Sequence, residues 1–458
     1  MTTGSAAIRQ EPPVKSCPPG PQGGGLTGDL REFTADRLGT LSRWAREYGD
    51  LVSARFGPRR ILFVNHPDLV EEVLVHQNRK LIKHYRLRQA KRTLGEGLLT
   101  SEGDFWRAQR KLVQPAFHRE KIAGFAELMV DYALRLVGTW GEGRELDVQA
   151  EMMRLTLQIV AKALFGADVG GESADVTAAM ETLMHNFEAS SALPIIIPQW
   201  VPTPSNLRTG AAIRRLNRVL YRIIAERRKD GEDRGDLLSM LLQAQDEESG
   251  RRMTDRQLRD ECMTLFLAGH ETTANTLSWA WYLLAKHPEA AARLREELEN
   301  VLGGRRPTLA DLPRLPYTEG VVNESLRLYP PAWIVGREAA EPIELGGYRV
   351  DRGTTLFLAA CAIHRDPRWF DDPDAFRPER WAGGFQQRIP RYAYFPFGGG
   401  PRICIGNSFA QMEVALVIAS IVPRYRLELA PSARVEPLAS MTLRMTHGLV
   451  MRVERLAR

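Results

Sequence analysis

The sequence predicts a mainly helical protein with a smaller β portion, an α+β fold built as a single large domain around a long central helix. Helical periodicity dominates residues 104–300, short strand patterns gather toward the two ends, and no linker interrupts the chain after its first segment. That first segment, residues 1–28, is rich in Pro and Gly and is predicted to be a flexible tail. We therefore expect one domain at 29–458.

The composition is that of an ordinary globular protein, with 44% hydrophobic and 26% charged residues. A net charge of +6 is a mild basic bias, which does not by itself indicate a nucleic acid partner. The four cysteines lie far apart and none forms a CxxC pair, so a disulfide framework and a structural zinc or iron–sulfur site are disfavoured. Since the N-terminus shows no signal peptide and no anchor helix, we expect a cytoplasmic protein without a membrane anchor.

The domain is predicted to begin with strands and to continue into helices. Two β-prone runs flank Gly57-Pro58 within residues 51–65 and predict a hairpin, after which His66-Pro67-Asp68 opens a helical pattern. The basic segment 79–92 contains one Tyr and no motif that reads nucleic acid. We interpret it as a solvated region, with the alternative that one of its cations anchors a substrate carboxylate.

Closely spaced prolines interrupt the helical region. In ALPIIIPQWVPTPSN, residues 192–206, the proline spacing forbids a helix and predicts an unusually apolar loop. Its isoleucines and Trp200 have two interpretations. They pack on the helices below, or they form a mobile lid over a substrate channel that makes transient contact with a membrane.

Short strand patterns return near the C-terminus and predict the rest of the β portion. They are PIELGGYRV (342–350), TTLFLAA (354–360), RYRLELA (424–430) and MTLRMTHGLVMRV (441–453).

The longest predicted element is a helix that starts at a capping box formed by Thr254 and Gln257. Its apolar pattern runs to Lys286, before His287-Pro288, which gives roughly 30 residues and a length of about 45–50 Å. The stretch LAGHETTAN, residues 267–275, lies in its middle and weakens the helix, because it holds a glycine and adjacent threonines. This stretch is either a solvent-facing patch with a glycine packing contact or an opened groove. In a groove, Glu271 and Thr272 would present a carboxylic acid and a hydroxyl to a small molecule.

A cysteine stands in the Gly-rich loop FGGGPRICIG, residues 397–406, directly before a helical pattern that ends at Pro423. Unpaired N–H groups and the positive end of the helix dipole favour a thiolate there, and Arg402 adds a cation. The cysteine has three interpretations: a buried structural cysteine, a nucleophile, and a metal ligand. A nucleophile needs a histidine base in a recognisable partner motif, which the sequence lacks. One thiolate flanked by glycines suits the axial ligand of a large flat cofactor.

With the loop and the groove in place, the sequence resembles the cytochrome P-450 haem-thiolate monooxygenases, and the resemblance covers nearly the whole chain. The cysteine signature of that family is met by Phe397, Gly400, Arg402, Cys404 and Gly406. The oxygen-activating helix motif is met by Ala268, Gly269, Glu271, Thr272 and Thr273. The further motifs WRAQR, ESLR, VGREA and FRPERW follow in the family's order.

The resemblance implies haem b, iron protoporphyrin IX, as the cofactor, with Cys404 as the ligand of the iron and the long helix crossing over the haem. Phe397 would shield the sulfur, and the glycines would let backbone amides approach it. The counterparts of residues that bind haem propionates are Trp106, Arg110, Arg337 and Arg402. The counterparts of a buried ion network on the cysteine side are Glu324, Arg327 and Arg380.

The implied reaction is insertion of one atom of O₂ into a C–H or C=C bond. Thr272 would hold a proton-donating water, and Glu271 would connect that water to bulk solvent. This pair favours an O₂-dependent monooxygenase over a peroxide-using haem-thiolate enzyme. The other alternative is a non-catalytic haem sensor or carrier on the same fold, which would not need Thr272. No flavin or ferredoxin segment follows the domain, so we expect electrons from a separate ferredoxin or flavodoxin with an NAD(P)H reductase.

The substrate is predicted to be lipophilic. Positions that line the family's pocket map onto Phe266-Leu267, residues 331–335 and Met445-Thr446-His447, and these are largely apolar. The run RLYPPAW is similar to bacterial members that hydroxylate fatty acids, retinoids and carotenoids. We therefore expect a substrate of fatty acid, terpenoid, retinoid or carotenoid type.

Overall fold

The computed structural model describes residues 17–166, 179, 182–183, 201–246 and 250–456. The predicted apolar loop lies outside these residues up to position 200, so both of its interpretations stay predictions. The first part of the predicted tail, residues 1–16, also lies outside them. Residues 17–28 lie along a strand, where the Ser53 N–H donates to the Pro19 carbonyl at 2.8 Å. The domain boundary at residue 28 remains a prediction.

The main sheet has five strands in the order β1-β2-β8-β5-β3. β1 and β2 form the hairpin predicted around Gly57-Pro58, with Val52 opposite Phe63. β8 runs parallel to β2 and pairs Thr355 with Ile61, so residues from both ends of the chain share one sheet. The strands are β1 (Leu51–Phe56), β2 (Arg59–Val64), β3 (Leu81–Lys83), β5 (Val335–Ala339) and β8 (Thr355–Leu358).

Three smaller sheets account for the other strands of the described residues: β4-β12-β9, β6-β7 and β10-β11. Strands lie in all four of the predicted C-terminal segments, so those predictions are confirmed. β12 pairs with both β9 and β4, which joins the end of the chain to its middle. The strands are β4 (Glu145–Asp147), β6 (Ile343–Leu345), β7 (Tyr348–Val350), β9 (Tyr425–Leu429), β10 (Pro437–Ala439), β11 (Leu443–Met445) and β12 (Val450–Arg455).

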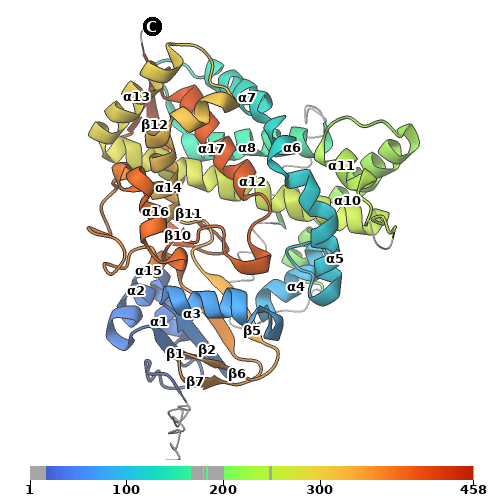
Figure 1. Cartoon of the computed structure of the whole chain (residues 1–458), viewed down its shortest axis with the longest axis vertical. Coiled ribbons are helices and arrows are strands. Elements are labelled where there is room, and N and C mark those ends of the chain that lie inside the picture. The colour runs from blue at the N-terminus through green and yellow to red at the C-terminus, as the bar shows by residue number, and fades with distance from the viewer. Residues whose placement is uncertain (1–16, 167–178, 180–181, 184–200, 247–249, 457–458) are drawn as a thin grey trace, which may run out of the picture.

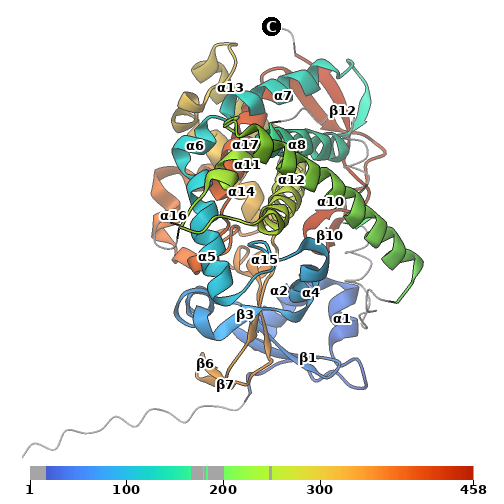
Figure 2. The same ribbon diagram turned by 90° about the vertical axis from the view of Figure 1, so that its right-hand side faces the viewer.

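The predicted long helix is α12 (Asp255–Lys286), which has 32 residues and a length of about 48 Å. Its capping box is present: the Gln257 N–H donates to the Thr254 hydroxyl, and the Thr254 N–H donates to the Gln257 side chain. Figure 1 shows α12 crossing the middle of the molecule, with the main sheet below it and helices above it. In Figure 2 the same helix is seen almost end-on at the centre.

The other helices surround α12. The α-helices are α1 (Leu30–Ala35), α2 (Arg37–Tyr48), α3 (Pro67–Glu71), α4 (Tyr85–Leu94), α5 (Gly103–Val113), α6 (Arg119–Ala123), α7 (Ala126–Gly138), α8 (Val148–Phe165), α10 (Pro204–Asp230), α11 (Leu237–Gln243), α13 (Pro288–Leu302), α14 (Pro316–Leu328), α15 (Ala360–Ile363), α16 (Phe385–Arg388) and α17 (Asn407–Ile421). Short 3-10 and π turns are η1 (Glu72–His76), η2 (Asn78–Lys80), η3 (Gln114–Phe117), η4 (Leu309–Arg314), η5 (Pro378–Gly384), η6 (Arg391–Ala393) and η7 (Gly400–Arg402).

The start of α10 corrects the predicted end of the apolar loop. The loop was predicted to continue to residue 206, but α10 begins at Pro204 with Thr203 as its N-cap. The Thr203 hydroxyl accepts the Asn206 N–H at 3.1 Å. Proline is tolerated in a first helical turn, because its missing N–H would have no helical partner there.

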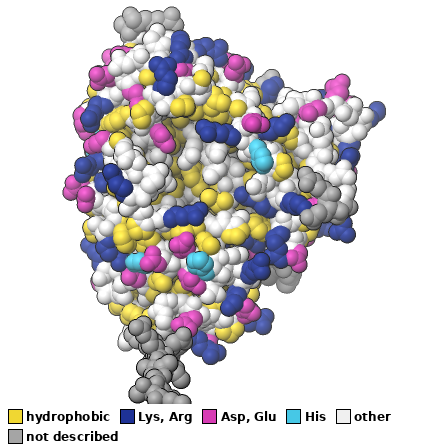
Figure 3. Space-filling view, in the orientation of Figure 1, with side chains coloured by type: hydrophobic (Ala, Val, Ile, Leu, Met, Phe, Trp, Pro, Cys, Tyr) yellow, Lys and Arg dark blue, Asp and Glu magenta, His cyan; other side chains and the backbone are white. Residues whose placement is uncertain are grey.

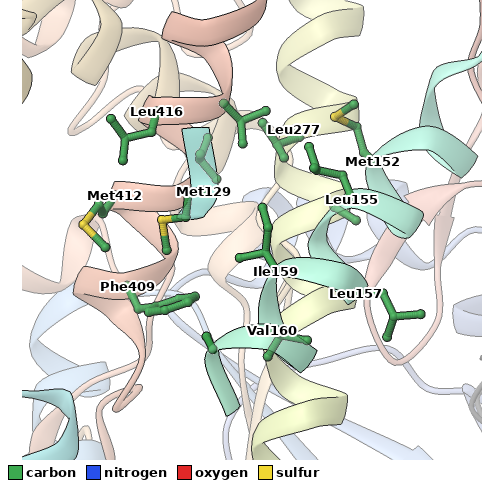
Figure 4. Packing of buried hydrophobic residues seen from close by; sticks show 14 of the residues in the cluster. Met129, Met152, Leu155, Leu157, Ile159, Val160, Leu277, Phe409, Met412 and Leu416 are labelled. Carbon is green, nitrogen blue, oxygen red and sulfur yellow. The ribbon is translucent and has the colours of Figure 1, made fainter. Parts of the chain in front are cut away.

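The main apolar core packs against α12 and holds it in place. Figure 4 shows Met152, Leu155 and Ile159 of α8 beside Leu277 of α12, with Met412 of α17 across the cluster. Long aliphatic side chains from several helices interlock here, so a displacement of α12 would open cavities in the core.

The described helices and the face shown in Figure 3 bear on possible contacts with a membrane. Among the described residues, no helix combines the length and apolarity needed to cross a bilayer. On the face shown in Figure 3, basic and acidic side chains are interspersed.

Candidate active site

Cys404 lies in a tight loop between η7 and α17. Its N–H donates to the Phe397 carbonyl at 2.9 Å, which folds the loop back on itself. α17 begins three residues later, so the predicted setting of a Gly-rich loop entering a helix is confirmed. From α5, the Arg110 guanidinium donates to the Ile403 carbonyl at 3.0 Å and brings a cation beside the thiol.

The Cys404 side chain is exposed, although protein surrounds it closely. Burial raises the pKa of the thiol above its usual value, while the Gly406 N–H and the Arg110 charge act in the opposite direction. This differs from the expectation that the loop alone favours a thiolate with Arg402 as the cation. The sulfur is thus accessible to a ligand while protein groups surround it. Such a thiol loses its proton when a metal takes the sulfur.

The loop can approach its neighbours only because it carries glycines. Gly400 has a φ of +62°, and a Cβ at this position would lie 2.0 Å from the Leu74 carbonyl oxygen of η1. A Cβ on Gly399 would lie 2.3 Å from the Tyr392 ring. Glycine at these positions therefore fixes the height of the cysteine loop over η1 and η6.

Basic side chains from three segments converge beside the loop, and we call Lys83, His84, Arg337 and Arg402 the cationic cluster. Burial lowers the pKa of Lys83 to about 6 and that of Arg337 to about 10, and the Arg402 charge adds to both effects. Burial and then Arg337 lower the pKa of His84 to about 4. Glu102 offsets part of this charge, because it accepts the Lys83 N–H at 2.7 Å and pairs with Arg402.

The cationic cluster fits a ligand that carries carboxylates. The Arg337 and Arg402 guanidinium groups are charged at neutral pH and repel each other, and an anion beside them relieves that repulsion and raises the lowered pKa values of Lys83 and His84. His84 Nδ1 and Ser101 Oγ are buried without a hydrogen-bond partner within the described part of the chain. Haem joined to Cys404 would bring two propionates to such a cluster, so the residues present fit this cofactor.

Trp106 and Arg402 lie together, as the resemblance implies for two residues that contact one cofactor edge. The Arg402 guanidinium stacks over the Trp106 ring, with its carbon 4.2 Å from the ring centroid. Arg402 also donates to the Ser101 carbonyl at 3.2 Å. These contacts hold the guanidinium in one orientation.

Glu324, Arg327 and Arg380 come together in a buried ion network. Glu324 and Arg327 are both 0% exposed and are joined by two hydrogen bonds of 2.7 and 2.8 Å. Arg380 reaches the same carboxylate at 3.4 Å, and the Trp381 N–H donates to it at 2.9 Å. Removing any member would leave an uncompensated buried charge.

The middle of α12 opens on one face. Residues on either side of it are buried, but Ala268 is exposed and Gly269 and Thr272 are partly exposed. A Cβ on Gly269 would lie 2.9 Å from Val160 of α8, so this glycine also permits close helix packing. The Thr272 hydroxyl donates back to the Ala268 carbonyl at 2.8 Å. The partly exposed face of α12 therefore presents the Thr272 hydroxyl, and the glycine packing contact is present as well.

Glu271 is buried on a neighbouring face of α12. Its carboxylate accepts a hydrogen bond from the Thr442 hydroxyl at 2.6 Å. The Asn275 amide reaches the same hydroxyl at 3.3 Å. Thr442, just before β11, was not among the predicted site residues, because nothing in the local sequence links it to α12.

Sequence analysis also missed His364, which joins the ion network to the cysteine loop. Its carbonyl accepts from Arg327 at 2.8 Å, and its Nε2 accepts the Phe395 N–H at 3.0 Å. Burial and the neighbouring Arg327 charge lower the pKa of His364 to about 3, so the ring is neutral. The sequence holds no local signal for this contact.

The positions predicted to line a substrate pocket differ in their surroundings. Phe266, Trp333 and Met445 are buried, whereas His447 is exposed beside Glu436. Their contact with a substrate stays a prediction.

Comparison with known proteins identifies the family. The chain matches the family model described as Cytochrome P-450 over residues 18–453. It is 40% identical to cyclooctatin synthase of Streptomyces melanosporofaciens over 398 residues, which cover 86% of this chain and 87% of that protein. Cyclooctat-9-en-7-ol 5-monooxygenase of the same organism is 39% identical over 402 residues, covering 86% and 87% of the two chains. Pentalenene oxygenase of Streptomyces avermitilis is 35% identical over 407 residues, covering 89% and 90%. Because the family model spans nearly the whole chain and several relatives exceed 30% identity, the chain belongs to the cytochrome P-450 family of haem b monooxygenases.

Proposed function

We propose that Cys404 is the axial thiolate ligand of haem b and that the enzyme oxygenates a lipophilic substrate of terpenoid type. The observation that carries the ligand assignment is the exposed Cys404 thiol beside the cationic cluster. Of the four cysteines, Cys262 and Cys361 are buried, and burial raises their thiol pKa values strongly. Cys17 is exposed but lies far from the cationic cluster in the fold, beside Ser53 of β1.

The residues of the cysteine loop and the cationic cluster have separate tasks. Cys404 would hold the iron as a thiolate, and the Gly406 N–H and the Arg110 charge would stabilise its negative sulfur. Arg337, Arg402, Trp106 and Arg110 hold the propionate edge, and Phe397, Gly400 and Gly406 shape the loop around the sulfur. When bound, the haem supplies the activation of O₂.

The groove of α12 supplies protons and excludes bulk water. Ala268 and Gly269 leave room beside the cofactor face, and the Thr272 hydroxyl holds a water molecule there. Glu271 delivers protons to that water, while Thr442 fixes the position of its carboxylate. Glu324, Arg327 and Arg380 support the cysteine-side core and take no part in proton transfer.

The names of three relatives support a terpenoid-type substrate. They describe oxygenation of cyclooctat-9-en-7-ol and of pentalenene, and formation of cyclooctatin. An apolar hydrocarbon suits the largely apolar positions around Phe266 and Met445, and fatty acids, retinoids and carotenoids remain the alternatives.

Electrons come from a separate ferredoxin or flavodoxin with an NAD(P)H reductase. The widely spaced cysteines, which are unpaired in the structure, support a cytoplasmic location.

The ligand assignment is tested by the absorption spectrum of the reduced, carbon-monoxide-bound protein. Wild type is expected to show the red-shifted Soret band of thiolate haem, and Cys404→His is expected to lose it. Cys17→His, the same change at the other exposed cysteine, is expected to keep the band. A folded wild-type protein that binds haem without the shifted band would overturn the assignment.

Catalysis is tested in the same preparation. Terpenoid substrates are expected to displace water from the ferric iron, seen as a spectral shift, and to raise oxygen consumption with a reductase pair. Haem binding without substrate-dependent oxygen consumption would instead support a haem sensor or carrier.

A further inference from the structure

Two neighbouring carboxylates of α12, Asp260 and Glu261, are 3% and 0% exposed. Burying such groups is unfavourable unless they find hydrogen-bond partners. The Glu96 N–H donates to Asp260 Oδ2 at 2.8 Å, and the Leu98 N–H donates to Glu261 Oε2 at 3.1 Å. The two carboxylates therefore bind the backbone of residues 95–102, which connect α4 to α5 and which we call the α4–α5 loop.

The α4–α5 loop lies directly on the helix. Gly95 has a φ of +83°, and a Cβ there would lie 2.0 Å from Asp260 Oδ1. A Cβ on Gly97 would lie 2.2 Å from the Thr264 hydroxyl and 2.6 Å from the Asp260 carbonyl oxygen. Glycines at both positions let the backbone come within hydrogen-bond distance of the carboxylates.

The same loop continues into the cationic cluster. The Leu98 carbonyl accepts from Lys83 Nζ at 2.7 Å, so Leu98 is held by Glu261 at its N–H and by Lys83 at its carbonyl. Further along, the Ser101 carbonyl accepts from Arg402, and the Glu102 carboxylate binds both the Lys83 N–H and Arg402. A continuous series of hydrogen bonds thus joins α12 to the basic side chains beside Cys404.

We propose that Asp260 and Glu261 are positioning residues for the cofactor site: they clamp the α4–α5 loop to α12 and thereby hold Lys83 and Arg402 in place to bind the haem carboxylates. This inference rests on the proposed function, in which the cationic cluster receives those carboxylates. Asp260 and Glu261 themselves touch neither the haem nor the substrate.

Glu261 has two donors to satisfy, which makes the clamp sensitive to its protonation. Besides the Leu98 N–H, the Gln109 amide of α5 donates to Glu261 Oε1 at 3.0 Å. Burial, with a smaller contribution from the Asp260 charge, raises the pKa of Glu261 to about 7, although the Leu98 and Gln109 hydrogen bonds and the Lys83 charge lower it. Above this pKa both oxygens accept; below it one oxygen carries a proton and a donor loses its partner. The clamp is therefore expected to loosen as the pH falls through about 7.

The test compares Glu261→Gln with wild type in the haem-loaded protein. Two rates are measured: hydrogen exchange of the amides in residues 95–101, and transfer of haem to an excess of apomyoglobin. The variant places an amide against the Gln109 amide and removes the charge, so both rates are expected to rise about tenfold or more. After correction for the intrinsic rate, amide exchange in wild type is expected to be faster at pH 6 than at pH 8. The variant is expected to show no such difference.

A swapped pair provides the rescue. In the double variant Glu261→Gln with Gln109→Glu, the donor and acceptor exchange places and the Leu98 N–H keeps an oxygen partner, so both rates are expected to return toward wild type. Glu296→Gln, the same chemical change on the exposed surface of α13, is the control and is expected to change neither rate. If Glu261→Gln does not fold, Gln109→Met removes one donor to Glu261, together with the acceptor of the Gln257 amide, and leaves the Leu98 N–H contact in place. It is expected to raise both rates by a smaller factor.

Three outcomes would overturn the inference. Unchanged amide exchange in the variant would show that the clamp does not hold the loop. Faster exchange with unchanged haem transfer would show that the loop does not position the cationic cluster. A wild-type protein without the thiolate spectrum would overturn the proposed function together with this inference, and that result is visible before any variant is made.

Discussion

Adjacent residues on an α-helix point about 100° apart, and this separates the two members of the Glu271–Thr272 pair. The Thr272 hydroxyl lies on the partly exposed face of α12, bonded to the Ala268 carbonyl. The Glu271 carboxylate lies on a buried face, bonded to Thr442. If the Glu271 side chain turned away from Thr442, it would lose this hydrogen bond. Proton delivery toward Thr272 therefore requires either an intervening water molecule or such a rotation of the Glu271 side chain.

The first prediction concerns Thr272→Ala, which removes the hydroxyl while leaving haem, substrate and O₂ binding intact. Consumption of NADH or NADPH with an active reductase pair is expected to stay near normal, because electron transfer precedes the step that needs the proton. Hydroxylated product is expected to fall about 10²–10⁴-fold, the range for lost acid–base assistance, with a matching rise in hydrogen peroxide. Thr276→Ala, which removes a buried hydroxyl one turn later, is the control. Full product yield per electron in Thr272→Ala would exclude the threonine from proton delivery.

At the scale of the elements, the close approach of Gly400 to η1 fixes the position of the cysteine loop. The second prediction is that Gly400→Ala destabilises the protein, because Ala pays about 1–2 kcal/mol for a positive φ and a further ~1–3 kcal/mol for the contact with the Leu74 carbonyl. Gly353→Ala is the matched control: its φ is +84°, but no atom lies within 4 Å of the added Cβ. Chemical unfolding measures both. Equal losses would show that the loop has room to move away from η1.

The elements that local signals define could be predicted from the sequence. The start of α12 follows from a capping box, its body from apolar periodicity, and its end from His287-Pro288. The hairpin around Gly57 follows from a turn between two β-prone runs. The three-residue strand β3 is too short to show an alternating pattern, and it was not predicted.

The site could be predicted only in part, for a related reason. The resemblance identifies Cys404, Arg402 and the α12 motif, because each lies in a recognisable stretch of sequence. Lys83 stands in a run of basic residues and was interpreted as solvated, yet it is 5% exposed. Its burial depends on the α4–α5 loop and on β5. Glu102 and Arg402 form their ion pair across 300 residues, a separation that no local pattern reveals.

At the scale of the whole molecule, buried neutral histidines make stability depend on pH. His364 has a pKa near 6.5 in the unfolded chain and about 3 in the folded protein. Between these pH values its ring is protonated in the unfolded chain and neutral in the folded protein. The stability contributed by this neutral ring is present above pH 6.5 and is lost as the pH falls toward 3. Burial lowers the pKa values of His84 and His270 in the same direction.

The third prediction is that His364→Gln, which keeps an acceptor for the Phe395 N–H, flattens this dependence. Wild type is expected to lose about 2 kcal/mol more than the variant between pH 6.5 and pH 5, since one group contributes about 1.4 kcal/mol per pH unit. Urea unfolding at these two pH values measures the difference. Equal losses of unfolding free energy in the two proteins would mean that His364 can be protonated in the folded protein.

Residues far apart in the sequence share one sheet and one site, and this sets the order in which these parts can assemble during synthesis. β8 pairs with β2, and Arg402 meets residues of the α4–α5 loop, so the cationic cluster cannot assemble until the ribosome has extended the chain past residue 402. At 5–20 residues per second, this leaves the Glu102 carboxylate without its Arg402 partner for roughly 15–60 s after its own synthesis. The cationic cluster, to which we assign the haem carboxylates, is therefore complete only in a nearly full-length chain.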